Sequence, residues 1–359
     1  TIGLDNPNIS NPIANPVNDV TYIVHHFDGM CTAEDTLIVV VHNEVPSATF
    51  STTNNCENDT VQFLANSGLS TSNISWNWSF GSTLQNPQSQ FIVGNNSVIL
   101  IVENLTNNCK DTLIQGVEVY PLPEANFIAN EVCFGENMHF LNNSSSNVVA
   151  WTYNMADGIG VSYDEDPIYL YQNIGSFNPI LVVVSDYGCE NNFVGVVKVN
   201  EVPSANFLVE NHCQGEENIF TDNSSINEGS IDFYNFDLGD GTISNNDTIV
   251  YYQYSQSGVY TVTLTIVSNK GCESEISKQT EVYEKPVIDF VSEQFCIGTP
   301  TYFTDFSYVN NGTIIEWSWG FGDGIGVSNI EHPTYTFNDI GTYQVGLSTT
   351  SSRGCTQSG

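Results

Sequence analysis

The sequence predicts an all-β chain built as a tandem array of two-layer sandwiches. Three observations predict it: cysteines recur in pairs, apolar and polar residues alternate in short segments, and no amphipathic helical segment of useful length is present. Alternation with a period of two marks a strand with one buried face. The stretches VYTVTLTIV and YQVGLS, at residues 259–267 and 343–348, show this alternation clearly.

The cysteines divide the chain into repeats. They stand at positions 31, 56, 109, 133, 189, 213, 272, 296 and 355, and short gaps of 25, 24, 24 and 24 residues alternate with gaps of 53, 56, 59 and 59. A phenylalanine lies six residues before four of them, each time in a segment that begins with proline: PSATF, PEANF, PSANF and PVIDF. A fixed period of this kind identifies repeated structural units. Units of short strands and polar turns indicate two-sheet sandwiches of the immunoglobulin type.

The proline-containing segments set the expected boundaries of the repeats. We place the first repeat at residues 46–120, the second at 121–200, the third at 201–284 and the fourth at 285–359. Residues 1–45 are expected to be the C-terminal part of a preceding immunoglobulin-like repeat, and the fourth repeat is expected to be truncated in its last strand. Both ends of the sequence are therefore expected to lie within a longer array.

The charge balance excludes several classes of partner. Only 6 Lys and Arg stand against 41 Asp and Glu, a formal net charge of -35, so the chain repels nucleic acid and anionic membrane surfaces. Hydrophobic residues make up 40% of the chain, which is enough for each repeat to bury a core. No apolar run reaches about 18 residues, so no membrane insertion is expected in this region, and no leader is visible at the start.

Large apolar residues recur at one place in every repeat, spaced by two. Because alternate residues of a strand point to the same face, they are expected to lie in the core. The expected core aromatic residues are Trp76, Trp78, Trp151, Tyr153, Phe236, Trp317 and Trp319.

An acidic residue between glycines follows these aromatic residues in three repeats, at Asp157, Asp240 and Asp323. Glycine supplies positive φ in a hairpin, and the carboxylate accepts backbone N–H groups, so we expect a turn role. A catalytic role would require a partner acid, base or nucleophile, and neither a GxSxG elbow nor an HExxH motif is present. The sequence therefore predicts no enzyme and no catalytic residue.

These residues carry a resemblance to a known family. The stretch WSWGFGDG, then His332-Pro333-Thr334-Tyr335, GTYQVGL at 341–347 and Gly354-Cys355 resemble the polycystic kidney disease (PKD) domain, whose hallmark is W-x-F-G-D-G followed by H-x-Y and G-x-Y-x-V-x-L. The third repeat has the same pattern, the second departs at Pro179, and the first is degenerate. The resemblance implies a seven-stranded sandwich that acts as a spacer, adhesive module or protein contact.

The tandem, cysteine-bearing and acidic form is similar to giant adhesins and gliding-motility surface proteins of Bacteroidota. This implies a non-catalytic stalk of a large surface adhesin, which is extracellular and has the neighbouring repeats, surface polysaccharide or other surface proteins as partners. The alternative is a set of carbohydrate-binding accessory modules of a secreted multidomain enzyme. An exposed, coplanar strip of aromatic residues would favour that alternative.

Two candidate ligands or modifications remain open. No cofactor is required, but calcium prefers carboxylate oxygens, and residues 163–166 with Asp157, Asp237 and Asp240 are candidate ligands. Four Asp-Thr-aliphatic segments are similar to the O-glycosylation acceptor of Bacteroidota. Their threonines are Thr36, Thr60, Thr112 and Thr248. The alternative is that Asp caps a turn and Thr opens a strand.

The cysteines are expected to form disulfides of an exported protein, since no zinc-like spacing is present. Pairing within repeats joins Cys56–Cys109, Cys133–Cys189, Cys213–Cys272 and Cys296–Cys355. In the immunoglobulin strand order, however, the two cysteines of a repeat lie at opposite ends, beyond the reach of about 7 Å between Cα atoms. We therefore favour a staggered scheme, and an irregular first strand would favour the other. The staggered pairs are Cys56–Cys189, Cys133–Cys272 and Cys213–Cys355, with Cys31, Cys109 and Cys296 left over.

Overall fold

The computed structural model describes residues 2–70, 73–293 and 296–359, and every regular element among them is a β-strand. The predicted all-β fold class is confirmed. None of these residues forms a helix long and apolar enough to cross a membrane. The chain divides into two compact units, residues 1–128, 141–167 and 179–195 in the first and residues 129–140, 168–178 and 196–359 in the second. This division passes through the second repeat.

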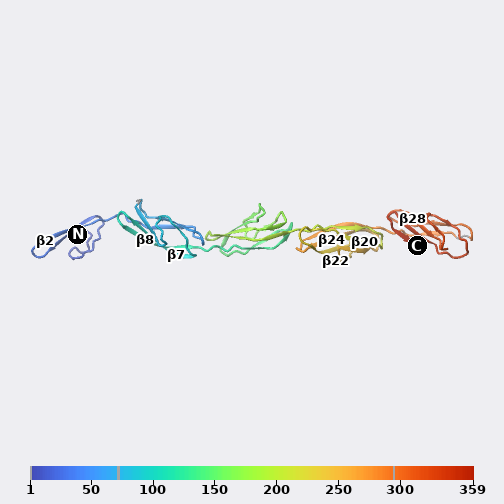
Figure 1. The fold of residues 1–359 in the computed structure, drawn as a ribbon, viewed down its shortest axis with the longest axis horizontal. Coiled ribbons are helices and arrows are strands. Elements are labelled where there is room, and N and C mark those ends of the chain that lie inside the picture. The colour runs from blue at the N-terminus through green and yellow to red at the C-terminus, as the bar shows by residue number, and fades with distance from the viewer. Residues whose placement is uncertain (1, 71–72, 294–295) are drawn as a thin grey trace. The chain divides into compact units, whose positions relative to one another are not determined.

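The first unit begins with a hairpin and contains the first repeat. The hairpin pairs β1 (Val20–Phe27) with β2 (Thr32–Val39). The first repeat has one sheet in the order β3-β4-β6 and a second in the order β5-β7-β8, where β7 and β8 carry labels in Figure 1. Its strands are β3 (Thr49–Thr53), β4 (Val61–Asn66), β5 (Ile74–Trp78), β6 (Gln88–Ser89), β7 (Gly94–Asn104) and β8 (Cys109–Val119).

The second repeat is the least regular of the four. Its sheet within the first unit has the order β13-β12-β16-β17, and its sheet within the second unit has the order β10-β18-β15. Its strands are β9 (Phe127–Ala129), β10 (Val132–Cys133), β11 (Met138–Asn142), β12 (Val148–Asn154), β13 (Val161–Ser162), β14 (Ile168–Tyr169), β15 (Gly175–Phe177), β16 (Ile180–Ser185), β17 (Glu190–Val194) and β18 (Val197–Asn200). The break between β15 and β16 falls at Pro179, which has no N–H to donate to a neighbouring strand.

The third repeat lies within the second unit and is the most regular sandwich. One sheet has the order β19-β20-β23 and the other the order β22-β21-β24-β25, so its described residues form seven strands (Figure 1, yellow to orange). The strands are β19 (Phe207–Glu210), β20 (Glu217–Asp222), β21 (Ile231–Asp237), β22 (Ile243–Asn245), β23 (Ile249–Gln253), β24 (Gly258–Ser268) and β25 (Glu273–Val282).

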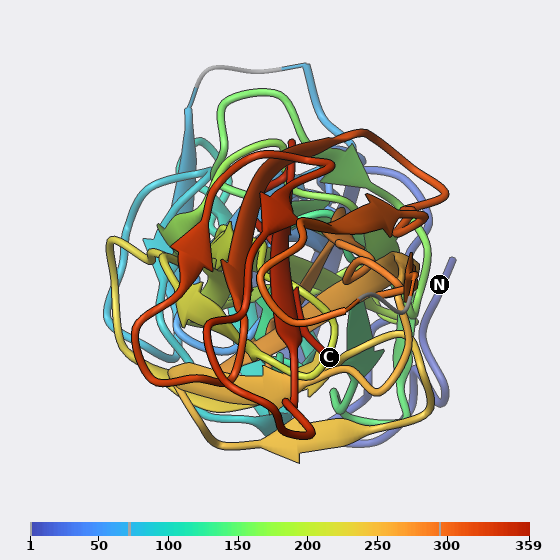
Figure 2. The ribbon, with the colours of Figure 1, turned by 90° about the vertical axis from the view of Figure 1, so that its right-hand side faces the viewer.

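The fourth repeat has the same two sheets, in the orders β26-β27-β30 and β29-β28-β31-β32, and its strands can be followed in red in Figure 2. They are β26 (Phe290–Ser292), β27 (Thr301–Asp305), β28 (Ile314–Gly320), β29 (Val327–Ser328), β30 (Thr334–Tyr335), β31 (Gly346–Ser351) and β32 (Thr356–Ser358). The shared order places the first cysteine of each repeat between its first two sandwich strands and the second cysteine at the start of its last strand.

The aromatic residues expected in the core differ in how far they are buried. Trp78, Tyr153, Phe236 and Trp319 are fully buried. Trp76 and Trp317 are only partly buried and pack against the cores of their repeats, and Trp151 is also partly buried. The first member of each aromatic series therefore lies at the margin of the core, a difference from the expectation. At this margin the indole N–H needs a polar partner, and the Trp317 Nε1 donates to the Asp305 carboxylate at 2.7 Å.

Replacing Trp319 by alanine should destabilise the fourth repeat by about 3 to 5 kcal/mol, because a fully buried indole leaves a cavity. Trp317→Ala should have a smaller effect, since that ring is only partly buried. Denaturant unfolding of the whole chain, followed by tryptophan fluorescence, measures both. Equal effects of the two changes would contradict the difference in burial.

Stability should also fall at alkaline pH. Burial, with the charges of Asp166 and Glu165, raises the pKa of Tyr153 to about 12 from an ordinary value of 10.0. A raised folded-state pKa means that the contribution is fully present below pH 10 and is lost as the pH rises toward 12. Denaturant unfolding at pH 9 and pH 11 should show this loss, and Tyr153→Phe should reduce it. An unchanged pH dependence in the variant would contradict the assignment.

Candidate functional site: the disulfide-linked junctions

Three disulfides join neighbouring repeats. They are Cys56–Cys189, Cys133–Cys272 and Cys213–Cys355, with Cα–Cα distances of 5.6, 5.5 and 5.6 Å. The structure thus contains the staggered set of pairs, and pairing within repeats does not occur among the described cysteines. Cys31 and Cys296 are exposed and unpaired, and the unpaired Cys109 is partly buried. Each disulfide lies within one of the two units.

The first cysteine of each pair is held at the end where the chain leaves its repeat, which we call the outgoing end. A parallel bridge joins Cys213 to Tyr283, directly after the last strand β25. The Gln214 N–H donates to the Tyr283 carbonyl at 2.8 Å, and the Tyr283 N–H donates to the His212 carbonyl at 3.1 Å. Cys56 makes the same bridge with Tyr120, and Val132 and Cys133 pair in parallel with Val199 and Asn200.

The second cysteine of each pair closes a tight turn at the opposite, incoming end. The turns read Ser-Asp-Tyr-Gly-Cys, Ser-Asn-Lys-Gly-Cys and Ser-Ser-Arg-Gly-Cys, ending at Cys189, Cys272 and Cys355. In the third repeat the Cys272 N–H donates to the Ser268 Oγ at 3.2 Å, and Gly271 has φ of 78°, which favours glycine. The other two turns repeat this geometry. All three of these cysteines are fully buried.

The side chain two residues before the second cysteine contacts the preceding repeat. Tyr187 stacks on Tyr120 with ring centroids 4.1 Å apart and an interplanar angle of 7°. The Arg353 guanidinium lies over the Tyr283 ring, 5.1 Å from its centroid. Ring stacking and cation–π contact therefore serve the same place in two different junctions.

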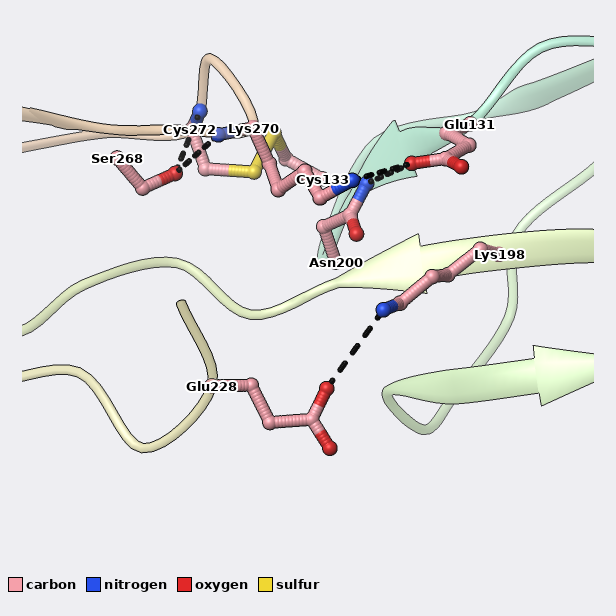
Figure 3. A network of polar contacts seen from close by, with 8 residues as sticks. All are labelled: Glu131, Cys133, Lys198, Asn200, Glu228, Ser268, Lys270 and Cys272. Atoms are coloured by element: carbon pink, nitrogen blue, oxygen red, sulfur yellow. Dashed lines mark hydrogen bonds and ion pairs between the residues drawn. A yellow bond between two sulfur atoms is a disulfide. The ribbon is translucent and has the colours of Figure 1, made fainter. Parts of the chain in front are cut away.

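In the junction between the second and third repeats this place is taken by Lys270 (Figure 3). Its Nζ lies 3.7 Å from the Glu131 Oε2, and the Asn200 amide donates to the same oxygen at 3.1 Å. The hydrogen bond from Asn200, followed by the charge of Lys270, holds the pKa of Glu131 below its ordinary value. The carboxylate therefore stays ionised beside the Cys133–Cys272 disulfide at neutral pH.

Each of the last two junctions has a further ion pair between repeats. Lys198 lies 3.7 Å from Glu228, and Lys285, in the link before the fourth repeat, lies 3.2 Å from Glu216 of the third repeat. Arg353 also lies 4.0 Å from Glu281. Thus four of the six cations of the chain face carboxylates across a junction.

Links between repeats are tied down in a parallel manner. Glu201 accepts hydrogen bonds from the backbone of Asn227 and Glu228, both at 3.0 Å, and from the Asn227 side chain. Glu284 accepts from the Asn310 N–H at 3.2 Å and from its side-chain amide at 2.6 Å. A glutamate of the link thus caps a loop of the following repeat in both cases.

Magnitudes decide which of these contacts holds a junction together. The charged side chains of the ion pairs are substantially exposed, and such pairs contribute about 0 to 1 kcal/mol each and weaken with salt. A disulfide that closes a loop of 133 to 142 residues contributes about 5 kcal/mol in the chain-entropy account. The disulfides dominate, and the polar contacts position the ends that they join.

The three turn acids bind backbone, as a turn role requires. The Asp323 carboxylate accepts the Ile325 and Gly326 N–H groups at 3.1 and 2.8 Å and also the Tyr335 hydroxyl. The Tyr335 hydroxyl, followed by the Gly326 N–H, lowers the pKa of Asp323. Asp240 and Asp157 accept equivalent backbone groups. His332 supports the same end of the fold, where its Nδ1 accepts the Asp305 N–H at 3.1 Å.

The candidate calcium ligands are occupied by local hydrogen bonds. Asp166 and Glu165 accept from the backbone and side chain of Asn142, and Asp164 accepts from the Ser162 hydroxyl. No group of three or more His, Cys, Asp or Glu side chains suited to a metal occurs in the part of the chain that the structure describes.

The four candidate glycosylation threonines lie on or beside strands. Thr36, Thr112 and Thr248 are exposed, and Thr60 is partly buried. Asp35 and Asp111 each accept the N–H of the following threonine, at 2.8 and 2.9 Å, as the capping alternative requires. Exposure also leaves three of the hydroxyls accessible, so their glycosylation stays a prediction.

Sequence reasoning missed the side chains that complete the junctions. Ser185, Ser268 and Ser351 stand four residues before the buried cysteines, and this fixed spacing before Gly-Cys was a signal that could have found them. The partners Glu131 and Lys270 had no such signal, because they lie in different repeats.

Peptide mapping without reduction should recover the pairs of the structure. We expect one peptide that links Cys213 to Cys355 and another that links Cys133 to Cys272, because these sulfurs are bonded. Peptides from chain alkylated before digestion should carry the label at Cys31, Cys109 and Cys296, which are unpaired. A peptide linking Cys213 to Cys272 would refute the staggered set.

Comparison with known proteins places the strongest likeness at the C-terminal repeats. The family model of the PKD domain matches residues 200–282 and 283–359. Collagenase ColA of Clostridium perfringens is 32% identical over 99 residues, which are 27% of this chain and 9% of the collagenase. The match thus spans about a tenth of that relative.

Solved PKD domains are also similar. The PKD1 domain of Vibrio anguillarum Epp is 29% identical, with a TM-score of 0.22, and the match covers 23% of this chain and 95% of that domain. The PKD1 domain of the Vibrio cholerae metalloprotease PrtV is 28% identical, with a TM-score of 0.21, and the match covers 23% and 96%. Together with the family match, these sequence likenesses show that the chain contains PKD domain repeats.

Proposed function

We propose that this chain is a non-catalytic, extracellular stalk region of a large surface adhesin, in which PKD repeats give reach and mechanical stiffness. The observation that carries the proposal is the disulfide between neighbouring repeats, which is present at three successive junctions. A chain that only displays independent binding modules has no need of covalent bonds between them. Disulfides persist in oxidising compartments, which supports an exported location.

The links between repeats favour stiffness for a second reason. Val202-Pro203 and Lys285-Pro286 leave only a few residues between the last strand of one repeat and the first strand of the next. Proline fixes φ, and the capping by Glu201 and Glu284 restrains the remaining residues. The neighbouring repeats are thus the principal partners of each repeat, with the boundaries 46–120, 121–200, 201–284 and 285–359 as the proposed units. Attachment to a gliding cell of the Bacteroidota type extends the proposal to a source.

The alternative function is that of carbohydrate-binding accessory modules beside a catalytic domain. The observation that favours it is the likeness to a collagenase, in a match that covers only a small part of that protein. A glycan array that also carries collagen distinguishes the two functions. Selective binding to a polysaccharide or to collagen would favour the accessory module, and the stalk predicts no such binding by this region.

Solution scattering tests the stalk directly. Four sandwiches in line, each on the order of 30 to 40 Å long, should give a maximum dimension of roughly 150 Å or more. After reduction with dithiothreitol the junctions should loosen and the distribution of distances should broaden. A compact, globular envelope for the oxidised chain would refute the proposed function.

A further inference from the structure

The two disulfides of the third repeat leave it at opposite ends. Cys213 lies beside Tyr283 at the outgoing end, and Cys272 immediately precedes β25 at the incoming end. The strand β25 of 10 residues separates the two ends, which is on the order of 33 Å at 3.3 Å per residue. Cys272 is bonded to the second repeat and Cys213 to the fourth.

Covalent connections therefore cross the third repeat by two short routes. One route enters through the Cys133–Cys272 disulfide and follows β25 to the link at residues 283–286. The other enters through the link at residues 200–203 and follows β19 to the Cys213–Cys355 disulfide. Residues 214–271, which include strands β20 to β24 and most of the core, belong to neither route.

We infer that the staggered disulfides carry tension along the first and last strands of each repeat and shield its interior from load. This inference rests on the proposed stalk function for its biological use, whereas the routes follow from the disulfide pairs alone. A strand already rises about 3.3 Å per residue, close to the limit of about 3.6 Å for an extended chain. Each route is thus almost fully extended in the folded state. Pulling cannot lengthen the array much, even if the interior of a repeat unfolds.

The same geometry explains how a repeat with a modest core can serve in a tether. Without disulfides, all residues of a repeat are in series, and unfolding under tension would release its whole length. With them, the interior is a side loop closed by Cys213 and Cys272, which are held in place by neighbours rather than by each other. The thermodynamic stability of the core then no longer sets the length of the tether under load.

Single-molecule force spectroscopy on the whole chain, held at its two ends, tests the inference. The shortest covalent route through the oxidised chain uses residues 1–56, 189–213 and 355–359, which stretch to about 300 Å, against about 1,300 Å for all 359 residues after reduction with dithiothreitol. Reduction should thus increase the final extension about fourfold. Pairing within repeats would instead give about 490 Å.

Two variants separate the staples from general effects on folding. Replacing both Cys213 and Cys355 by serine should raise the oxidised extension to about 700 Å, because the shortest route must then pass back through the second repeat. Cys296→Ser is the matched control and should leave it at about 300 Å, since Cys296 is unpaired. Circular dichroism checks that both variants remain folded.

An oxidised extension near 1,300 Å, with the disulfides mapped as intact, would overturn the inference. That result would leave the proposed stalk to be judged by scattering and by the glycan array. Conversely, binding of a polysaccharide would refute the stalk function without changing the measured extension. The two proposals therefore fail in different experiments.

Discussion

A short parallel pairing between the end of the first strand and the end of the last strand governs the junctions. In the third repeat it is the bridge between Cys213 and Tyr283, and the backbone hydrogen bonds on either side fix its register. This pairing brings the first cysteine to the outgoing end, beside the link to the next repeat. If the first strand paired elsewhere, the sulfur would not meet the Ser-x-x-Gly-Cys turn of the following repeat, and the positions of the Glu201 and Glu284 caps would lose their meaning.

Charge placement supports this arrangement in a strongly acidic chain. With a net charge of -35, neighbouring repeats repel each other wherever their surfaces approach. Lys198, Lys270, Lys285 and Arg353 are the cations that face carboxylates across junctions, so the few positive charges offset repulsion where it is greatest. The first junction uses the stacked rings of Tyr120 and Tyr187 instead. Different chemistry at one structural position indicates that contact there matters more than the kind of contact.

Much of this could be predicted from the sequence, because the deciding signals are local or periodic. The alternation that buries Phe236 and Trp319 and the Gly-Asp-Gly turn at Asp323 are read within a few residues. The staggered pairs followed from strand order and the reach of a disulfide. The partial burial of Trp317 was not foreseen, since it depends on Asp305 across the sandwich. The Glu131–Lys270 pair was beyond sequence reasoning because its members are 139 residues apart and lie in different repeats.

The offset of the cysteines also affects how such arrays evolve. Each repeat contributes its first cysteine to the joint on one side and its second cysteine to the joint on the other, as the third repeat does with Cys213 and Cys272. Duplication or loss of one whole unit by recombination therefore leaves every interior cysteine with a mate, whatever the number of units. The covalent joints are polar, always running from a first cysteine to the next second cysteine, and so genes for such arrays can change length freely without new cysteines.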